Sequence, residues 1–282
     1  MIATPSPTPP AVLYKYVGCA PHHLSILQRL QIRFTQPDDL NDPFDCVPGV
    51  VPPADMAKFV GDTIARNRAI MLASGRTERH IEIAREAMTR EYTKDPDALV
   101  ARCTTIIRRN LNSLGVLSLA LRNDNMPLWA HYSANHGGFA VGLRTDGGPL
   151  TQRSTDVATE GELRPVIYQA NRVIVPCDPL VLTPDVLFIK GSQWSYEEEW
   201  RVVRRLASCD QALSAPSGVH LCNVEPRTVV RVDVGRNAAD TTIDAVIAAT
   251  APGTPLQHVD VYRARLDAGG AALGFELLQR GC

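Results

Sequence analysis

The sequence predicts an α+β fold: a mixed, mostly antiparallel β core with a helical insertion. Two observations lead to this prediction. Outside residues 54–113, segments with strand character outnumber helical ones and do not alternate regularly with helices, as they would in a doubly wound fold. Within 54–113, Arg, Glu, Ala and Ile alternate and strand formers are few, which favours amphipathic helices. We therefore expect one domain over 11–282, preceded by a disordered tail over 1–10.

The segments before and within the insertion each carry a local signal. Residues 11–17 are β-branched and aromatic, which is typical of a strand, and the alternating residues 31–35 predict a second strand. Between them, leucines at helical spacing predict a helix over 22–30. Prolines and aspartates make 36–45 a rigid, polar loop. The insertion is interrupted at an Ala-Ser-Gly and a Lys-Asp-Pro step, so we expect two or three helices there.

Strand signals return after the insertion. Pro127 falls near the first turn of a short helix expected over 125–136, and another helix is expected over 240–250. The short apolar segment 184–189 fits either kind of element. Alternating or continuous apolar segments predict strands over 115–121, 139–143, 163–168, 200–204, 220–224, 229–234, 259–263 and 274–278.

Composition and charge exclude several classes of protein. Among 282 residues, 29 Lys and Arg balance 30 Asp and Glu, and 45 % of the residues are hydrophobic. These values rule out a disordered chain and argue against nucleic-acid binding through bulk electrostatics. No apolar run approaches the ~18 residues of a membrane helix, and the N-terminus lacks the features of a secretory signal. Seven scattered cysteines without a C-x-x-C pair argue against a zinc ribbon or a disulfide framework. We therefore expect a cytoplasmic protein.

The strongest chemical signal is the segment 190–201, KGSQWSYEEEWR. On a strand, Glu197 and Glu199 project to one side and the glutamate between them to the other. Two carboxylates on one face, beside Trp194 and Tyr196, tend to raise one pKa and prepare that group for acid–base or electrostatic work. The alternative is a solvated acidic turn whose tryptophans anchor the core.

A second signal is the sequence WAHY at 129–132. On a helix, Trp129 and Tyr132 share a face while His131 points elsewhere. A histidine near aromatic side chains is a candidate acid or base because its pKa lies near neutrality. The alternative is a helix that packs its aromatic stripe against the core and leaves His131 satisfied or exposed.

The sequence NDPFD at 41–45 is a third signal. Asp42 and Asp45, with two further aspartates just before them, are oxygen ligands of the kind that hard cations prefer. The spacing matches no calcium loop, because it lacks the required glycine and the terminal glutamate. A turn in which Asn41 and Asp42 cap backbone amides is the better reading, so we predict no metal.

The fourth signal lies on the first strand. Tyr14 and Tyr16 face one side of it and Lys15 faces the other. A buried lysine on the side opposite the aromatic rings would bind a phosphate or a carboxylate. The alternative is an edge-strand lysine in water. P-loop, dinucleotide-binding, hydrolase-elbow and zincin motifs are missing from the sequence.

Taken together, these pieces resemble the bacterial family called domain of unknown function 2971. The resemblance spans roughly residues 12–205 and rests on the order of the motifs: the Tyr-Lys-Tyr strand, the NDPFD loop, a helical stretch, LWAHY with Gly138-Phe139, a strand ending in Tyr168, and the segment 190–201. Leu40 stands where the family more often has an aromatic residue. The resemblance implies where the site lies and supplies no activity.

The motif layout is more distantly similar to that of ADP-ribosyltransferases, and this similarity implies NAD as a substrate and an ADP-ribosyltransferase-like core. In that scheme Glu197 and Glu199 form the E-x-E pair: Glu199 polarises the ribose and stabilises an oxocarbenium-like transition state, and Glu197 orients or deprotonates the acceptor. Tyr132 or another aromatic ring would stack on nicotinamide, and Lys15 would contact the pyrophosphate. A carboxylate beside a developing cation acts only in the transition state. The usual early His or Arg and the middle S-T-S triplet are absent, which makes this an analogy.

Three function classes follow. The first is an NAD-consuming, ADP-ribosyltransferase-like enzyme, in the setting of a toxin or phage-defence effector, with a small-molecule nucleotide as its partner. The second is a metal-dependent hydrolase or nuclease that uses Asp42, Asp45 and Glu199. The third is a non-catalytic binding module, with near-neutral titration of Glu199 and no deep pocket. In the third class Arg201 locks a loop by pairing with an aspartate such as Asp42. The expected site contains Tyr14, Lys15, Tyr16, Asn41, Asp42, Asp45, Trp129, His131, Tyr132, Trp194, Tyr196, Glu197, Glu199 and Arg201.

Overall fold

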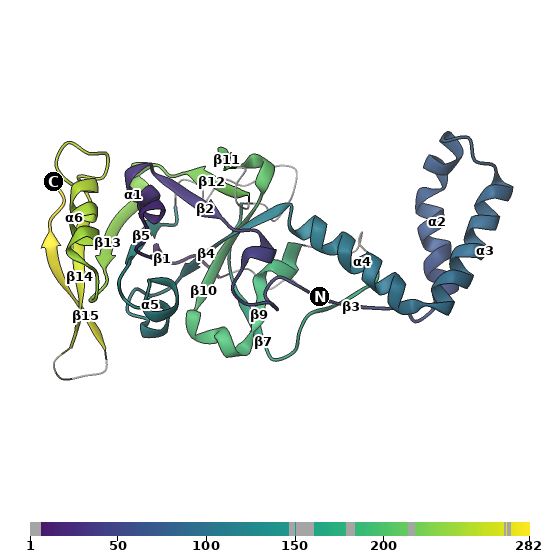
Figure 1. Cartoon of the computed structure of the whole chain (residues 1–282), viewed down its shortest axis with the longest axis horizontal. Helices are drawn as coiled ribbons and strands as arrows, with labels where there is room; N and C mark the ends of the chain where they lie inside the picture. The colour runs from purple at the N-terminus through teal and green to yellow at the C-terminus, as the bar shows by residue number, and fades with distance from the viewer. Residues whose placement is uncertain are drawn as a thin grey trace.

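The centre of the fold is an eight-stranded mixed sheet in the order β15-β14-β13-β5-β1-β4-β10-β6 (Figure 1). Strands β13 and β14 pair in parallel, and the other neighbours pair antiparallel. The computed structural model describes residues 7–146, 150, 161–178, 184–213, 218–267, 269 and 272–282. The large sheet is mixed and mostly antiparallel, and helices accompany it, so the predicted α+β class is confirmed. The strands span Val12–Val17 (β1), Leu114–Ala120 (β4), Phe139–Arg144 (β5), Leu163–Pro165 (β6), Glu199–Arg205 (β10), Val229–Val234 (β13), Asp260–Leu266 (β14) and Leu273–Gln279 (β15).

Three small sheets surround the large one. Strand β2 pairs with β12 and β12 with β11, while β3 pairs with β8 and β7 with β9. Of these short strands, β2 and β3 flank the NDPFD loop in the sequence and β9 opens the acidic segment, so their pairings help to position the loops of the site. They span Gln31–Phe34 (β2), Gly49–Val51 (β3), Ile167–Gln169 (β7), Ile174–Pro176 (β8), Ile189–Gly191 (β9), Gln211–Leu213 (β11) and Val219–Asn223 (β12).

The main core lies on one face of the large sheet. Apolar side chains of β1, β4, β5 and β13 meet those of α1 (Ser25–Gln28), β2, β12 and α6 (Asp240–Ala249) in this core. Helix α5 (Met126–Tyr132) packs on the other face, where Trp129 and Leu128 contact Tyr16 and Ala140. Side chains of β1 therefore pack into two separate hydrophobic clusters, Leu13 and Val17 on one face of the sheet and Tyr16 on the other.

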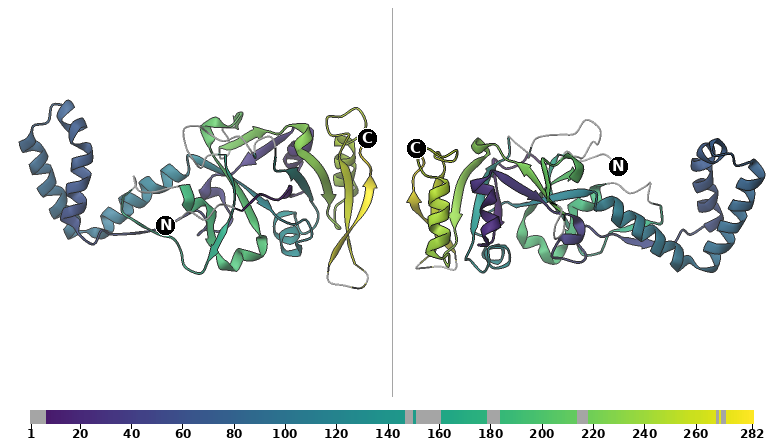
Figure 2. Two further views of the ribbon diagram at one scale, coloured as in Figure 1. Left: turned by 180° about the vertical axis from the view of Figure 1, so that it is seen from behind. Right: turned by 45° about the horizontal axis from the view of Figure 1, so that its top comes forward.

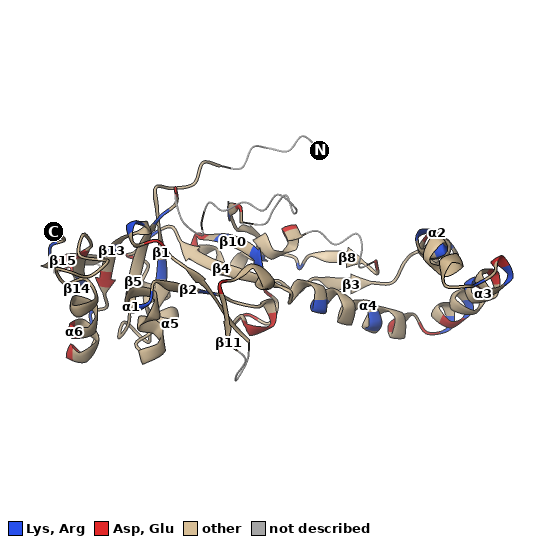
Figure 3. Cartoon of the chain, turned by 90° about the horizontal axis from the view of Figure 1, so that it is seen from above, with Lys and Arg blue, Asp and Glu red and all other residues tan. Residues whose placement is uncertain are grey.

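The insertion forms a helical arm that projects from the body (Figure 1), and two further views show the same separation (Figure 2). It consists of α2 (Met56–Ala73), α3 (Glu78–Lys94) and α4 (Pro96–Leu111). Asp55, Thr77 and Asp95 cap the three N-termini through side-chain hydrogen bonds to backbone N–H groups. The arm carries Lys, Arg, Asp and Glu side by side (Figure 3). The expected helices and both interruptions are confirmed.

Several elements differ from the sequence prediction. The strand expected over 163–168 is two strands, β6 and β7, which belong to different sheets. The helix expected over 125–136 ends at Tyr132, because Ala134, Asn135 and His136 have positive φ angles of 48°, 52° and 63°. The segment 184–189 is mostly a 3-10 turn, η4 (Pro184–Phe188). Strands β3, β8 and β11 were not predicted; each has three residues, too short for a periodic signal.

The C-terminal third completes the large sheet through β13, β14 and β15. Of the expected tail, residues 1–6 lie outside the described part of the chain. Among the described helices, none is both long and apolar enough to span a bilayer.

Candidate functional site

A pocket of about 270 Å³ lies where β1 and β4 separate. The two strands are paired at one position, Tyr14 with Ala120. Further along the same edge of β4, Val116 pairs with Thr35, which follows β2. Ser118 lies between these two pairing positions and lines the pocket. The divergence of two neighbouring strands therefore opens the sheet and creates the site.

The pocket gathers predicted residues from four distant segments. Residues of β1, of the NDPFD loop, of α5 and of the acidic segment all contribute to its wall. The predicted residues that line it are Tyr14, Lys15, Tyr16, Asn41, Asp45, Tyr132, Glu197 and Glu199. The loop and the acidic strand thus meet on one face, as the proposed grouping requires.

The two glutamates reach the pocket by an unexpected backbone path. Glu197 ends the 3-10 turn η5 (Ser192–Glu197), and Glu199 begins β10. Between them Glu198 has a left-handed conformation with φ 45°. With Glu198 in this conformation, the carboxylates of Glu197 and Glu199 are both buried, while Glu198 stays half-exposed. The same-side prediction for Glu197 and Glu199 is confirmed, although strand alternation is not its cause.

Lys190 is the cation on which the carboxylates converge. Its Nζ lies 2.5 Å from Glu197 Oε2, 3.3 Å from Glu199 Oε2 and 3.5 Å from Asp45 Oδ2. Its ammonium also lies 4.9 Å from the centre of the Trp194 ring, a cation–π contact. Burial lowers the pKa of Lys190, but the surrounding carboxylates outweigh burial and raise the pKa overall. Lys190 therefore carries a permanent charge at neutral pH.

Arg201 fixes the NDPFD loop to β10. Its side chain is fully buried, and its Nη2 lies 2.6 Å from Asp45 Oδ2 while its Nε lies 2.7 Å from Glu199 Oε1. Its Nη1 also donates to the carbonyl of Leu187 at 2.6 Å. Arg201 therefore pairs with an aspartate of this loop, as expected, but the partner is Asp45 and not Asp42. Asp42 Oδ1 instead accepts the backbone N–H of Phe44 at 2.9 Å and caps the turn.

The pKa values of Glu197 and Glu199 are displaced in opposite directions. Burial raises the pKa of Glu199, but the charges of Arg201 and Lys190 outweigh it and lower that pKa to about 2. Burial and the charge of Glu199 raise the pKa of Glu197, and the opposing attraction of Lys190 does not cancel them. Such a split gives two carboxyl groups different chemical roles in one site. Glu199 remains ionised, while Glu197 can exchange a proton.

Tyr132 connects Glu197 to the NDPFD loop. Its hydroxyl donates to Glu197 Oε1 at 2.7 Å and accepts a hydrogen bond from Asn41 Nδ2 at 3.1 Å. Burial and the charge of Glu197 raise the pKa of Tyr132, so the hydroxyl stays protonated and remains a donor. The last turn of α5 therefore orients the carboxylate that can exchange a proton.

Lys15 bridges the gap between the separated strands. Its Nζ donates to the carbonyl of Ser118 at 3.1 Å. Burial lowers its pKa to about 8, and the nearby charge of Arg33 acts in the same direction. Arg33 also lines the pocket, together with its ion-pair partner Asp39 at 2.7 Å. Two cations therefore face the same cavity, a suitable arrangement for an anionic group.

Six predicted residues lie outside the wall of this pocket: Asp42 and Arg201, described above, and Trp129, His131, Trp194 and Tyr196. Trp129 is fully buried, and its Nε1 donates to the carbonyl of Asn123 at 2.6 Å, so it is a core residue. His131, Trp194 and Tyr196 form an aromatic cluster beside the pocket, with ring centres 6.1–6.4 Å apart. His131 is exposed. Trp129 therefore packs against the core, as the alternative interpretation of the WAHY sequence expected.

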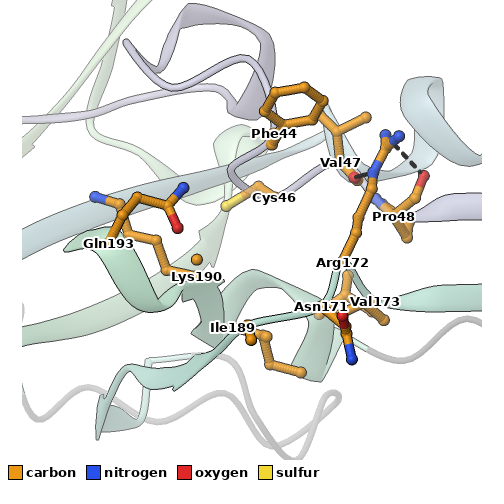
Figure 4. Close-up of a pocket in the computed structure, with 13 residues that line it drawn as sticks. Phe44, Cys46, Val47, Pro48, Asn171, Arg172, Val173, Ile189, Lys190 and Gln193 are labelled. Carbon is orange, nitrogen blue, oxygen red and sulfur yellow. Dashed lines mark hydrogen bonds between the residues drawn. The ribbon is translucent and has the colours of Figure 1, made fainter. Parts of the chain in front are cut away.

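A second pocket of about 180 Å³ is lined by the end of the NDPFD loop, by residues 170–173 and by residues 189–191 (Figure 4). Phe44 and Arg172 both line it, and Arg172 donates to the carbonyls of Val47 at 2.8 Å and Pro48 at 3.3 Å, shown as dashed lines in Figure 4. Lys190 lines this pocket as well as the one between β1 and β4. One buried lysine thus separates the two cavities.

Sequence reasoning gave no role to Lys190, Arg33, Ser118 or Tyr168. Tyr168 accepts a hydrogen bond from the backbone N–H of Glu199 at 2.8 Å and so positions that residue. For Lys190 a signal existed: it is one of only four lysines, and it opens the acidic segment. The contributions of Arg33 and Ser118 depend on strand divergence, which has no local signal in the sequence.

A metal ion does not fit the centre of this cluster. The position between Asp45, Glu197 and Glu199 is filled by the ammonium of Lys190. Within the described ranges, no group of three or more His, Cys, Asp or Glu side chains is arranged to hold a metal. The carboxylates are therefore balanced by protein cations.

Comparison with protein families, with curated proteins and with solved structures finds no match for this chain. The resemblance to the domain of unknown function 2971 family stays a prediction that rests on the motifs quoted above.

Proposed function

We propose that this protein is an NAD-consuming, ADP-ribosyltransferase-like enzyme whose reaction takes place between Glu197 and Glu199. The observation that carries the proposal is that these two carboxyl groups line one pocket, share the cation Lys190 and have pKa values displaced in opposite directions. An acid–base group beside a permanent anion is the arrangement that cleavage of a glycosidic bond requires.

In the proposed reaction, the bond between C1′ of the nicotinamide ribose and the nicotinamide nitrogen breaks. The bonding electrons leave with nicotinamide, which becomes neutral, and positive charge develops on the ribose. The anionic Glu199 stabilises that charge in the transition state. An acceptor nucleophile then forms a bond to C1′ and gives its proton to Glu197, whose raised pKa suits it to this step. Water as the acceptor would give hydrolysis instead of transfer.

The size and wall of the pocket support one end of a dinucleotide. Its volume of about 270 Å³ is close to the lower limit of small-molecule sites, roughly 300 Å³. The pocket therefore suits the nicotinamide riboside half, with the remainder of NAD outside. The rings of Tyr14 and Tyr132 offer surfaces for nicotinamide, and Lys15 and Arg33 offer charge for the pyrophosphate.

The two alternatives receive less support. A metal-dependent hydrolase needs its carboxylates around a divalent ion, and here they surround Lys190. A binding module predicts near-neutral titration of Glu199 and no deep pocket, whereas a pocket is present and the pKa of Glu199 is about 2. The broader setting of a toxin or phage-defence effector stays a prediction.

The proposal is tested by incubating the protein with NAD labelled in its adenylate half, in bacterial lysate, while nicotinamide release is measured in parallel. We expect label transfer or nicotinamide release, and Glu197→Gln should lower either by about 10²- to 10⁴-fold. Glu198→Gln is the matched control, because Glu198 lies between the two glutamates but outside the pocket wall. No turnover and no NAD-induced thermal shift in the unmodified protein would overturn the proposal.

A further inference from the structure

Cys209 and Cys222 hold their sulfur atoms 3.4 Å apart. Cys209 follows the 3-10 turn η6 (Leu206–Ser208), and Cys222 lies in β12, so the contact joins two segments that flank β11. The pairing of Gln211 with Leu221 fixes the register of these segments. The backbone N–H of Asn223 donates to the Asp210 carboxylate at 2.7 Å and fastens them on the other side. The two thiols are therefore held in contact by the sheet.

The surroundings of this pair favour a thiolate. Hydrogen bonding with Cys209 lowers the pKa of Cys222 to about 7, against the effect of burial, and the charge of Arg204 adds to the lowering. Arg204 Nη1 lies 3.9 Å from Cys222 Sγ, and its guanidinium lies 5.7 Å from the centre of the Phe34 ring. A thiolate beside a guanidinium is the reactive form of cysteine.

The other buried cysteines have different surroundings. The thiols of Cys103 and Cys177 also interact with each other, but each donates to a backbone carbonyl as well, Cys103 to that of Cys177 at 3.5 Å and Cys177 to that of Leu99 at 3.6 Å. Burial raises the pKa of Cys177 to about 12. Burial likewise raises the pKa of Cys46, whose sulfur contacts Asp45. The raised pKa values keep the thiols of Cys46 and Cys177 protonated at neutral pH, so these two cysteines serve as internal comparisons.

We propose that Cys209 and Cys222 form a dithiol site that a hydroperoxide converts into an intramolecular disulfide. The proposal does not depend on the proposed function. Cys209 is partly exposed, which gives a small oxidant a route to the pair. Disulfide formation moves the sulfurs from 3.4 Å to about 2.05 Å, within reach of side-chain rotation.

The reaction balances in two steps. The Cys222 thiolate attacks one oxygen of hydrogen peroxide, the O–O bond breaks and hydroxide leaves, so that Cys222 becomes a sulfenic acid. The Cys209 sulfur then attacks the Cys222 sulfur; the S–S bond forms, and the hydroxyl group leaves with the Cys209 proton as water. The two thiols together lose two electrons, and the peroxide is reduced to two molecules of water.

Peptide mapping after peroxide treatment tests this site. The reduced protein is treated with hydrogen peroxide, its remaining thiols are alkylated, and the digest is analysed by mass spectrometry without reduction. We expect the free thiols to fall by two from the seven present, with a peptide that links Cys209 to Cys222. A reducing agent should restore both thiols.

Serine variants separate the two steps. Cys209→Ser should stop the reaction at a Cys222 sulfenic acid, which dimedone traps, whereas Cys222→Ser should prevent both trapping and cross-linking. Cys177→Ser is the matched control and should leave the cross-link unchanged. Thermal unfolding of each variant checks that it is folded. A cross-link between Cys103 and Cys177 instead, or oxidation of Cys222 to a sulfinic acid without a cross-link in the unmodified protein, would overturn the proposal.

Discussion

The ammonium of Lys190 lies 2.5 Å from Glu197 and 3.3 Å from Glu199, so two carboxylates share one cation. Arg201 adds a second positive charge beside Glu199, with contacts of 2.7 Å and 3.0 Å to its two oxygens. Glu197 receives no such second cation; its other oxygen accepts the neutral hydroxyl of Tyr132. This difference in partners explains why the pKa values of the two glutamates are displaced in opposite directions.

Loss of Arg201 should destabilise the fold strongly. Arg201→Met leaves Asp45 and Glu199 buried without their guanidinium partner, and breaking a buried ion pair from one side costs about 3–5 kcal/mol. The measurement is urea unfolding at neutral pH. Arg85→Met removes a surface ion pair with Glu82 and should leave the unfolding midpoint nearly unchanged. Equal midpoints for the two variants would contradict a structural role for Arg201.

The two glutamates should change the pH dependence of stability in opposite senses. The pKa of Glu197 is higher in the folded state than its usual 4.5, so the unfolded state loses this proton at lower pH than the folded state does. Stability therefore falls as pH rises from 4.5 to the pKa of the folded state. Glu197→Gln should therefore become more stable relative to the unmodified protein as pH increases above about 4.5. Glu199 has a folded-state pKa of about 2, so its contribution is present above 4.5 and is lost as pH falls towards 2.

Glu199→Gln should accordingly be destabilised above pH 4.5 and approach the unmodified protein near pH 2. Chemical unfolding at a series of pH values measures both differences. Glu198→Gln provides the reference, since this neighbour is half-exposed. If the stability differences of Glu197→Gln and Glu199→Gln from the unmodified protein changed with pH in the same direction, the pKa values of the two carboxyl groups would not be displaced in opposite directions.

Tyr132→Phe should shift the pH–rate profile of the proposed reaction. The Tyr132 hydroxyl donates to Glu197 at 2.7 Å and stabilises its ionised form, so its removal raises the pKa of Glu197. Because Glu197 must be ionised to accept a proton, the acidic limb of kcat/KM should move to higher pH. Tyr196→Phe, in the aromatic cluster outside the pocket wall, should leave the limb in place. An unchanged limb in Tyr132→Phe would argue against Glu197 as the proton acceptor.

Lys15 should make NAD binding sensitive to pH near 8. Its pKa of about 8 means that it is protonated below this pH and loses its charge above it. If it contacts the pyrophosphate, KM for NAD rises as pH passes 8, and Lys15→Gln removes this rise. The variant should bind NAD roughly tenfold or more weakly at pH 7, since one charge-assisted hydrogen bond is lost. Isothermal titration with NAD measures this, and equal affinity at pH 7 would place the pyrophosphate elsewhere.

The local sequence determined most of the regular elements. Strands β1, β2, β4, β5, β10 and β13 and the three helices of the arm follow from apolar periodicity, capping residues and breakers within each segment. The sequence also singled out residues 190–201 and the NDPFD loop as candidate site segments, because charged and aromatic side chains are concentrated there. Both contribute residues to the pocket between β1 and β4. These signals are local, so each can be recognised without knowing which other segments pack against it.

The tertiary structure alone decided how those segments act together. The separation of β1 from β4 creates the pocket, and it depends on Thr35 taking the place beside Val116 that β1 leaves free. The choice of Asp45 over Asp42 as the partner of Arg201 depends on a turn in which Asp42 is already used by the N–H of Phe44. Which of the two glutamates has the raised pKa and which the lowered one depends on distances to Lys190 and Arg201. Such distances arise only when segments remote in sequence are packed together.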